Sequence, residues 1–334
     1  MFRKAIFSKL LAQRLSHILF LRKREYHRAV KLLHELESKF KGKIDPFTFE
    51  KIAKSYSIYV LMFADAFTQI EGRNTTEQEK MRMVHYFICS SLFDDFCDRM
   101  DFDLERLRDI SFHQNTFQPQ NFEEALFLYS HQFLLSEIRD QERYIQISHL
   151  LFQSQIDSFA QAELEAIPEE KLKKITEDKG GYSVLISGYY LDISMTTKLE
   201  NVYFAIGSII QIINDLFDIF KDLQEKSQTI PNKLKDVNQF ENYFNSLVNQ
   251  LIKNIFALQL SPKRREKLHF ALMNICAFGY VAIDNLKNIQ NNQTSLPDLS
   301  ILARKALIVD MEKWSNIWFC IKVCYEKQWI KNIL

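Results

Sequence analysis

Residues 201–226, NVYFAIGSIIQIINDLFDIFKDLQEK, form the most strongly patterned segment of the chain. Its apolar residues recur at three- and four-residue spacing and cover most of the circumference of a helix, which predicts a largely buried α-helix. One line of polar side chains follows this helix in four-residue steps and consists of Asn214, Asp218 and Asp222. A buried carboxylate without a partner costs roughly several kcal/mol. The stretch therefore predicts a metal ion, a water-filled cavity or both beside this line.

Three further polar residues belong to the same segment. Gln211 and Glu225 continue the line in both directions, and Asp215 lies beside it. The line contains no histidine or cysteine, so its donors are oxygen atoms. Oxygen-only sites favour hard cations. The segment thus predicts a Mg²⁺ site, with Mn²⁺ as the alternative ion.

A second acidic line is expected in residues 81–100, MRMVHYFICSSLFDDFCDRM. Asp94 and Asp98 are four residues apart and Asp95 is three residues from Asp98, so the three carboxylates project from one helix face. Like charges at this spacing repel each other, and a cation would neutralise them. A single acidic line is more often a solvated surface. Two such lines in one helical chain favour metal binding over that alternative.

The composition predicts an all-α fold in a single domain over residues 1–334. The chain contains only 7 Gly and 6 Pro, whereas sheet folds need many tight turns built from these residues. A hydrophobic content of 47% is enough for a sizeable core. Thr76 is expected to cap the helix that contains residues 81–100, with Glu79 as its capping-box partner. Short breaks between helices are expected at 42–46, 71–76, 113–120, 168, 179–181, 228–231, 261–262 and 291–297.

The net charge argues against nucleic-acid binding, and the hydropathy argues against a transmembrane segment. The net charge of +1 gives no general attraction to nucleic acid. No apolar run reaches the roughly 18–20 residues needed to cross a bilayer. The five cysteines, an odd number without zinc-ligand spacing, favour a reducing compartment, and the expected location is the cytoplasm.

The N-terminal segment, residues 1–24, is basic and amphipathic. It contains seven Lys and Arg residues and no acidic residue. Three interpretations stay open: an organelle-targeting segment, a helix in peripheral contact with a membrane, or an ordinary first helix packed on the body of the protein.

Both acidic motifs resemble those of the class I isoprenoid synthase superfamily. Asp94-Asp95-x-x-Asp98 is similar to its aspartate-rich motif, and Asn214 with Asp218 and Asp222 is similar to the second metal motif of terpene cyclases. Here Asp218 and Asp222 stand where the cyclases have a hydroxyl residue and a Glu. The resemblance implies an antiparallel helical bundle around an apolar cavity, three Mg²⁺ ions bound by these six residues, and a homodimer as an open alternative to a monomer.

The function that this resemblance implies is the Mg²⁺-dependent ionisation of a linear prenyl diphosphate. A terpene synthase, a carbon–oxygen lyase, would release diphosphate and form a terpene hydrocarbon or alcohol, with Asp94, Asp95, Asn214 and Asp218 as catalytic residues. The segment is also similar to squalene and phytoene synthases, which have Gln, Asn, Asp and Asp at the spacing of its polar line. A prenyl-coupling or chain-elongating transferase is therefore the second hypothesis, and a non-catalytic helical partner subunit is the third.

Three further residues are expected to contact the diphosphate. They are Lys179, Gln211 and Lys221. Lys179-Gly180-Gly181 is expected to interrupt a helical region, either as a loop whose backbone N–H groups face phosphate oxygens or as a plain connection.

Overall fold

The computed structural model describes residues 2–98, 103–163 and 165–328. Within these ranges every regular element is helical and there is no strand, which confirms the predicted all-α class. The chain divides into two compact units, residues Met1–Gln141 with Tyr189–Ile193, and residues Glu142–Gly188 with Ser194–Leu334. The prediction of a single domain stays a prediction.

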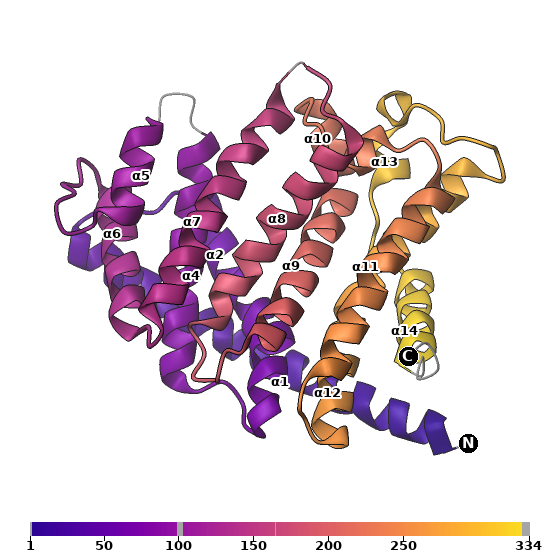
Figure 1. Cartoon of the computed structure of the whole chain (residues 1–334), viewed down its shortest axis with the longest axis horizontal. Helices are drawn as coiled ribbons and strands as arrows, with labels where there is room; N and C mark the ends of the chain where they lie inside the picture. The colour runs from indigo at the N-terminus through magenta and orange to yellow at the C-terminus, as the bar shows by residue number, and fades with distance from the viewer. Residues whose placement is uncertain (1, 99–102, 164, 329–334) are drawn as a thin grey trace. The chain divides into compact units, whose positions relative to one another are not determined.

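Unit 1 begins with a long helix and continues through shorter ones (Figure 1). Its elements are α1 (Phe2–Phe40), α2 (Pro46–Tyr59), the π-helical turn η1 (Val60–Ala64), α3 (Asp65–Thr68), the 3-10 turn η2 (Gln69–Glu71), α4 (Glu77–Asp98), α5 (Leu104–Phe112) and α6 (Phe122–Glu137). Helix α2 packs on both α1 and α4, and α4 packs on α6. Fully buried residues such as Ile52 and Ile88 form the core between these helices.

The predicted capping box at the start of α4 is confirmed. The backbone N–H of Glu79 donates to the Thr76 hydroxyl at 3.2 Å, and the Thr76 N–H donates to the Glu79 carboxylate at 2.6 Å. Two N–H groups that the first helical turn leaves without a partner are thereby satisfied. The start of α4 is thus determined by local sequence.

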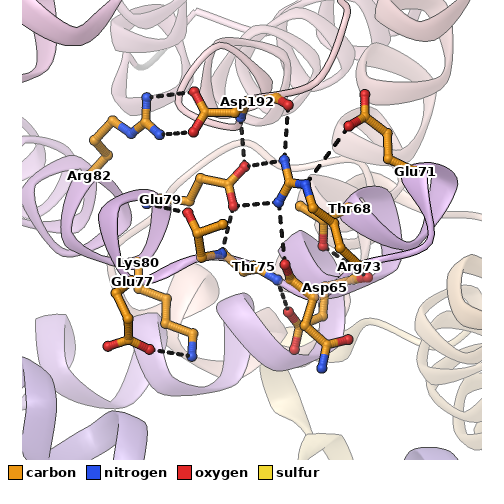
Figure 2. A network of polar contacts seen from close by, with 12 residues as sticks. Asp65, Thr68, Glu71, Arg73, Thr75, Glu77, Glu79, Lys80, Arg82 and Asp192 are labelled. Carbon is orange, nitrogen blue, oxygen red and sulfur yellow. Dashed lines mark hydrogen bonds and ion pairs between the residues drawn. The ribbon is translucent and has the colours of Figure 1, made fainter.

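The same Glu79 belongs to a buried ionic network that ties residues 189–193 into unit 1 (Figure 2). Its carboxylate accepts two hydrogen bonds from Arg73, at 2.7 and 2.8 Å, and one from the backbone N–H of Asp192 at 2.6 Å. Arg82 in turn pairs with both oxygens of Asp192, at 3.1 and 2.6 Å. Burial opposes the charge on Glu79, but these hydrogen bonds outweigh it and its pKa lies below the usual value.

Unit 2 contains the remaining helices. Its elements are α7 (Gln141–Ser158), the 3-10 turn η3 (Phe159–Ala162), α8 (Glu169–Gly188), α9 (Thr197–Phe217), α10 (Ile219–Gln224), the 3-10 turn η4 (Pro231–Lys233), α11 (Val237–Ala257), α12 (Pro262–Gln290), the 3-10 turn η5 (Leu299–Ile301), α13 (Arg304–Leu307) and α14 (Trp314–Gln328).

Helix α9 is the centre of unit 2 and packs against α8, α11 and α12. Its apolar residues Val202, Ile206 and Ile209 are fully buried, as the spacing of the sequence predicts. Helices α8 and α9 run antiparallel and side by side (Figure 1). The prediction of a largely buried helix in this stretch is confirmed for α9.

Most of the predicted breaks coincide with connections between helices, but the break at 179–181 is wrong. Helix α8 runs without interruption from Glu169 to Gly188. A Cβ atom on Gly180 would lie 2.5 Å from the carbonyl oxygen of Gly207, and one on Gly207 would lie 2.4 Å from that of Gly180. The glycines therefore permit close contact of two helix backbones rather than a loop.

Gly207→Ala is expected to destabilise the protein by about 1–3 kcal/mol, because its new methyl group meets a backbone carbonyl that cannot move alone. Gly188→Ala is the matched control, since its Cβ first meets the flexible end of Met195 at 2.9 Å. Denaturant unfolding of both variants measures the difference. Equal losses would mean that the backbone contact of Gly180 and Gly207 is not what limits this position.

No helix in the described part of the chain combines the length and the apolarity needed to cross a membrane.

Candidate functional site

The first acidic line lies at the C-terminal end of α4, and its described carboxylates are engaged by α2. Lys51 donates to Asp94 Oδ2 at 3.2 Å, and the Thr48 hydroxyl donates to Asp95 Oδ2 at 2.8 Å. Both carboxylates are half-buried. The side chain of Asp98 lies outside the described residues. Asp94 is therefore already paired with a cation, and Asp95 already accepts a hydrogen bond.

The second line spans the end of α9 and the start of α10. Helix α9 ends at Phe217, and Asp218 leaves helical geometry with φ −98° and ψ 8°. The four-residue register nevertheless continues through this interruption. The N–H of Asp218 donates to the carbonyl of Asn214 at 2.9 Å, and the N–H of Asp222 donates to that of Asp218 at 2.9 Å. Asn214, Asp218 and Asp222 therefore lie about one helical turn apart along the same line, as the sequence predicts.

The burial of this line differs from the prediction. Asn214 and Asp218 are exposed, Asp222 is half-buried, and the buried carboxylate is Asp215, at 7% exposure. The expectation that the line itself is buried was therefore wrong for two of its three members. Because α8, α11 and α12 cover the other faces of α9, the line turns toward solvent and Asp215 turns inward.

Asp215 is the most unusual group of the cluster. Its Oδ1 accepts a hydrogen bond from Gln211 Nε2 at 2.8 Å, while its buried Oδ2 has no hydrogen-bond partner among the described residues. Burial raises the pKa of Asp215 to about 7; the Gln211 hydrogen bond opposes this rise and the charges of Asp222 and Asp218 add to it. Near neutral pH this carboxyl is therefore poised between its neutral and its charged form.

Asp222 is perturbed in the same direction. Burial and the negative charge of Asp218 raise the pKa of Asp222 to about 6. Asp215, Asp218 and Asp222 therefore repel one another across the end of α9, and we refer to these three residues as the acidic cluster. A bound cation would relieve the repulsion and favour the charged form of all three.

The three predicted diphosphate contacts fall in different places. Gln211 lies on the buried side and holds Asp215. Lys179, on α8, is close enough for its charge to lower the pKa of Asp215. Lys221 is 66% exposed, and its ammonium lies 3.9 Å from the carboxylate of Glu225. Gln211 and Lys179 are thus next to the buried carboxyl, while Lys221 faces solvent.

A polar group that sequence reasoning missed lies beside the acidic cluster. The Tyr243 hydroxyl on α11 donates to Glu177 Oε1 on α8 at 2.7 Å, and the Lys173 ammonium lies 5.1 Å from the centre of the Tyr243 ring. Burial, the bond to Glu177 and nearby negative charges including Asp215 raise the pKa of Tyr243. No spacing in the sequence links Tyr243 to Glu177, because α11 and α8 are far apart in the chain and these two side chains meet only through tertiary packing.

The candidate metal ligands at the acidic cluster suit a hard cation, because all of them are oxygen atoms. One of them, Asp215 Oδ2, is buried and has no hydrogen-bond partner among the described residues. Mg²⁺ usually binds one or two carboxylates and completes its octahedron with water and phosphate oxygens. Among the described residues, no group of three or more His, Cys, Asp and Glu side chains is arranged to hold a metal ion by itself. The cluster fits a metal that arrives with a phosphate-bearing ligand better than a site made only of protein ligands.

Comparison with known proteins gives no family: neither a family model nor a curated protein matches the chain.

Proposed function

We propose that the chain is a Mg²⁺-dependent enzyme of the class I isoprenoid synthase type, which ionises a linear prenyl diphosphate and releases diphosphate to give a terpene hydrocarbon or alcohol. The observation that carries the proposal is the buried Asp215 carboxyl, whose Oδ2 has no partner among the described residues, beside Asp218 and Asp222. In this proposal the helices form a bundle around an apolar cavity that takes the prenyl chain.

The residues in and around the acidic cluster have different roles in the proposal. Asp218 and Asp222 would hold Mg²⁺ together with the amide oxygen of Asn214. Asn214 and Asp218 are exposed and Asp222 is half-buried, so an incoming ligand can reach this line from solvent. Mg²⁺, when bound, would neutralise the charge that develops on the leaving diphosphate. Lys179 adds positive charge on the α8 side, and Gln211 orients Asp215.

The roles proposed for Asp94, Asp95 and Asp98 rest on their motif. Lys51 already neutralises part of the charge of Asp94, so a metal ion there would have to compete with an ion pair at 3.2 Å. Since Lys51 and Asp94 are both partly exposed, at 35% and 41%, this competition costs little.

The test is incubation of the full chain with geranyl, farnesyl and geranylgeranyl diphosphate, each with Mg²⁺, followed by measurement of released diphosphate and mass analysis of the organic extract. Asp218→Asn and Asp222→Asn are expected to lower diphosphate release by about 100-fold or more, because each removes charge that holds the metal. Glu142→Gln, an exposed carboxylate in the first turn of α7, is the matched control and should retain activity.

Three outcomes would contradict the proposal in different ways. A condensed product of two prenyl units would make the chain a coupling transferase. An elongated prenyl diphosphate would make it a chain-elongating transferase. If no donor released diphosphate, a non-catalytic helical partner subunit would be the better account.

A further inference from the structure

An exposed face of apolar and basic residues runs along the N-terminal half of α1. Leu15, Leu19 and Phe20 are 46%, 74% and 81% exposed. Leu15 and Leu19 share one side of the helix with Arg22 and Lys23, which follow Leu15 at seven and eight residues. We define the α1 face by six exposed residues that are either large and apolar or basic, which are Lys9, Leu15, Leu19, Phe20, Arg22 and Lys23. Large apolar side chains gathered on a surface in this way mark an interaction site.

The opposite side of α1 is fixed to the rest of unit 1. The Arg14 guanidinium donates to the carbonyl oxygen of Met62 in η1, and His17 Nε2 lies 2.6 Å from Asp65 Oδ2 in α3. Asp65 is 2% exposed and also accepts from the N–H of Thr75 at 2.8 Å. Because these contacts prevent rotation of the helix, Leu19 and Phe20 cannot turn inward.

The charge of this segment selects the partner. The chain from Met1 to Arg24 has seven Lys and Arg residues and no acidic residue. Basic side chains beside exposed Leu and Phe are the pattern of a helix that lies in the interface of an anionic membrane. A second copy of the same face would meet it with like charge, which is unfavourable.

We propose that the α1 face binds an anionic membrane surface. Leu15, Leu19 and Phe20 enter the boundary between headgroups and acyl chains, while Arg22 and Lys23 contact lipid phosphates. The protein then lies on the membrane without crossing it. This inference does not depend on the acidic cluster or on the proposed function.

The experiment is co-flotation of the full chain with vesicles of phosphatidylcholine alone and of phosphatidylcholine with about a third phosphatidylserine. Binding is expected only to the anionic vesicles, and it should weaken with added salt because screening reduces the attraction. The triple variant L15Q/L19Q/F20Q is expected to bind about tenfold or more weakly, since it removes the inserted apolar area. The variant R22Q/K23Q should lose binding by a similar factor while retaining the apolar residues.

Two matched controls and one further readout make the test specific. F47Q and I301Q remove apolar side chains that are 78% and 77% exposed on other elements, and they should leave vesicle binding unchanged. Helical circular dichroism should be the same in all variants. Equal binding of the triple variant would overturn the proposal.

Two alternatives would give distinct results: another surface of the protein at the membrane, or another partner on the α1 face. The three tryptophans of the chain all lie at or beyond Trp314, and Trp314 and Trp318 are 84% and 71% exposed on α14. A blue shift of tryptophan emission on vesicles, retained in the triple variant, would place α14 rather than α1 at the lipid. A concentration-dependent dimer without lipid, lost in the triple variant, would assign the face to a second copy of the chain.

Discussion

Replacing Glu79 by alanine is expected to lower the free energy of unfolding by about 3–5 kcal/mol, the usual loss when one partner of a buried ion pair is removed. Glu79 is fully buried and accepts hydrogen bonds from Arg73 and from the N–H groups of Thr76 and Asp192. The variant leaves all of these donors without their acceptor. It also removes the capping box of α4, which is worth about 1 kcal/mol by itself. Chemical denaturation at neutral pH measures the loss.

The matched control is Glu77→Ala, two residues earlier on the same helix. Glu77 is 65% exposed, although it pairs with Lys80 at 3.3 Å. Exposed ion pairs are worth about 0–1 kcal/mol, so this variant should lose no more than that. A similar loss in both variants would show that the ionic network of Figure 2 does not hold residues 189–193 in unit 1. Glu79→Gln keeps an acceptor for the N–H groups and should give an intermediate loss.

Replacing Asp215 by asparagine is expected to make the protein more stable, by about 2–4 kcal/mol at pH 8 in the absence of divalent cations. Burial raises the pKa of Asp215 from 3.8 to about 7. Below about pH 4 the carboxyl is neutral in both the folded and the unfolded state, so it has no effect there. Between about pH 4 and 7 the unfolded state loses its proton first, and stability falls as pH rises. Above about pH 7 the ionised Asp215 carboxylate lowers the free energy of unfolding by the full amount, and this loss is absent from the asparagine variant.

The measurement is the free energy of unfolding as a function of pH, from about pH 4 to pH 8, in the presence of EDTA. The curve of Asp215→Asn should be flatter than that of the unmodified protein over this range. Asp218→Asn is the matched control, because Asp218 is exposed and its replacement relieves only the repulsion that it exerts on its neighbours. If Asp215→Asn is less stable than the unmodified protein at pH 8, the buried carboxylate has a favourable partner and the argument for a cation there fails.

Magnesium extends the same experiment to the proposed function. A ligand that binds only the folded state stabilises it in proportion to the logarithm of its concentration. Mg²⁺ with inorganic diphosphate should therefore stabilise the unmodified protein and have less effect on Asp215→Asn. If Asp215→Asn is more stable but is no longer stabilised by Mg²⁺ with diphosphate, the buried carboxylate lowers the stability of the protein and contributes to ligand binding. Such a trade-off between stability and function is typical of binding sites.

Local structure could be predicted from the sequence where neighbouring residues decide it. Thr76 and Glu79 are three residues apart and satisfy each other, so the start of α4 follows from a tetrapeptide. The apolar spacing of Val202, Ile206 and Ile209 identifies the buried side of α9 in the same way. The all-α class follows from these patterns and from the scarcity of glycine and proline.

The Gly180-Gly181 pair could not be interpreted locally. Glycine is typical both of breaks and of close helix contacts, and only the partner helix distinguishes the two. Here a Cβ atom on Gly180 would lie only 2.5 Å from the carbonyl oxygen of Gly207. The preference of glycine for loops is overridden because the packing of α8 on α9 stabilises the continuous helix.

The acidic cluster shows the same division. The alignment of Asn214, Asp218 and Asp222 follows from their spacing alone, because a helix repeats every 3.6 residues and the backbone keeps this register through Asp218. The burial of Asp215 does not follow from spacing, since it depends on the packing of α8, α11 and α12 around α9. Tertiary packing likewise brings Tyr243 to Glu177 from another helix. Sequence periodicity fixes which residues share a face, whereas the identity of the covered face, and with it the pKa of each carboxyl, depends on contacts between residues far apart in the chain.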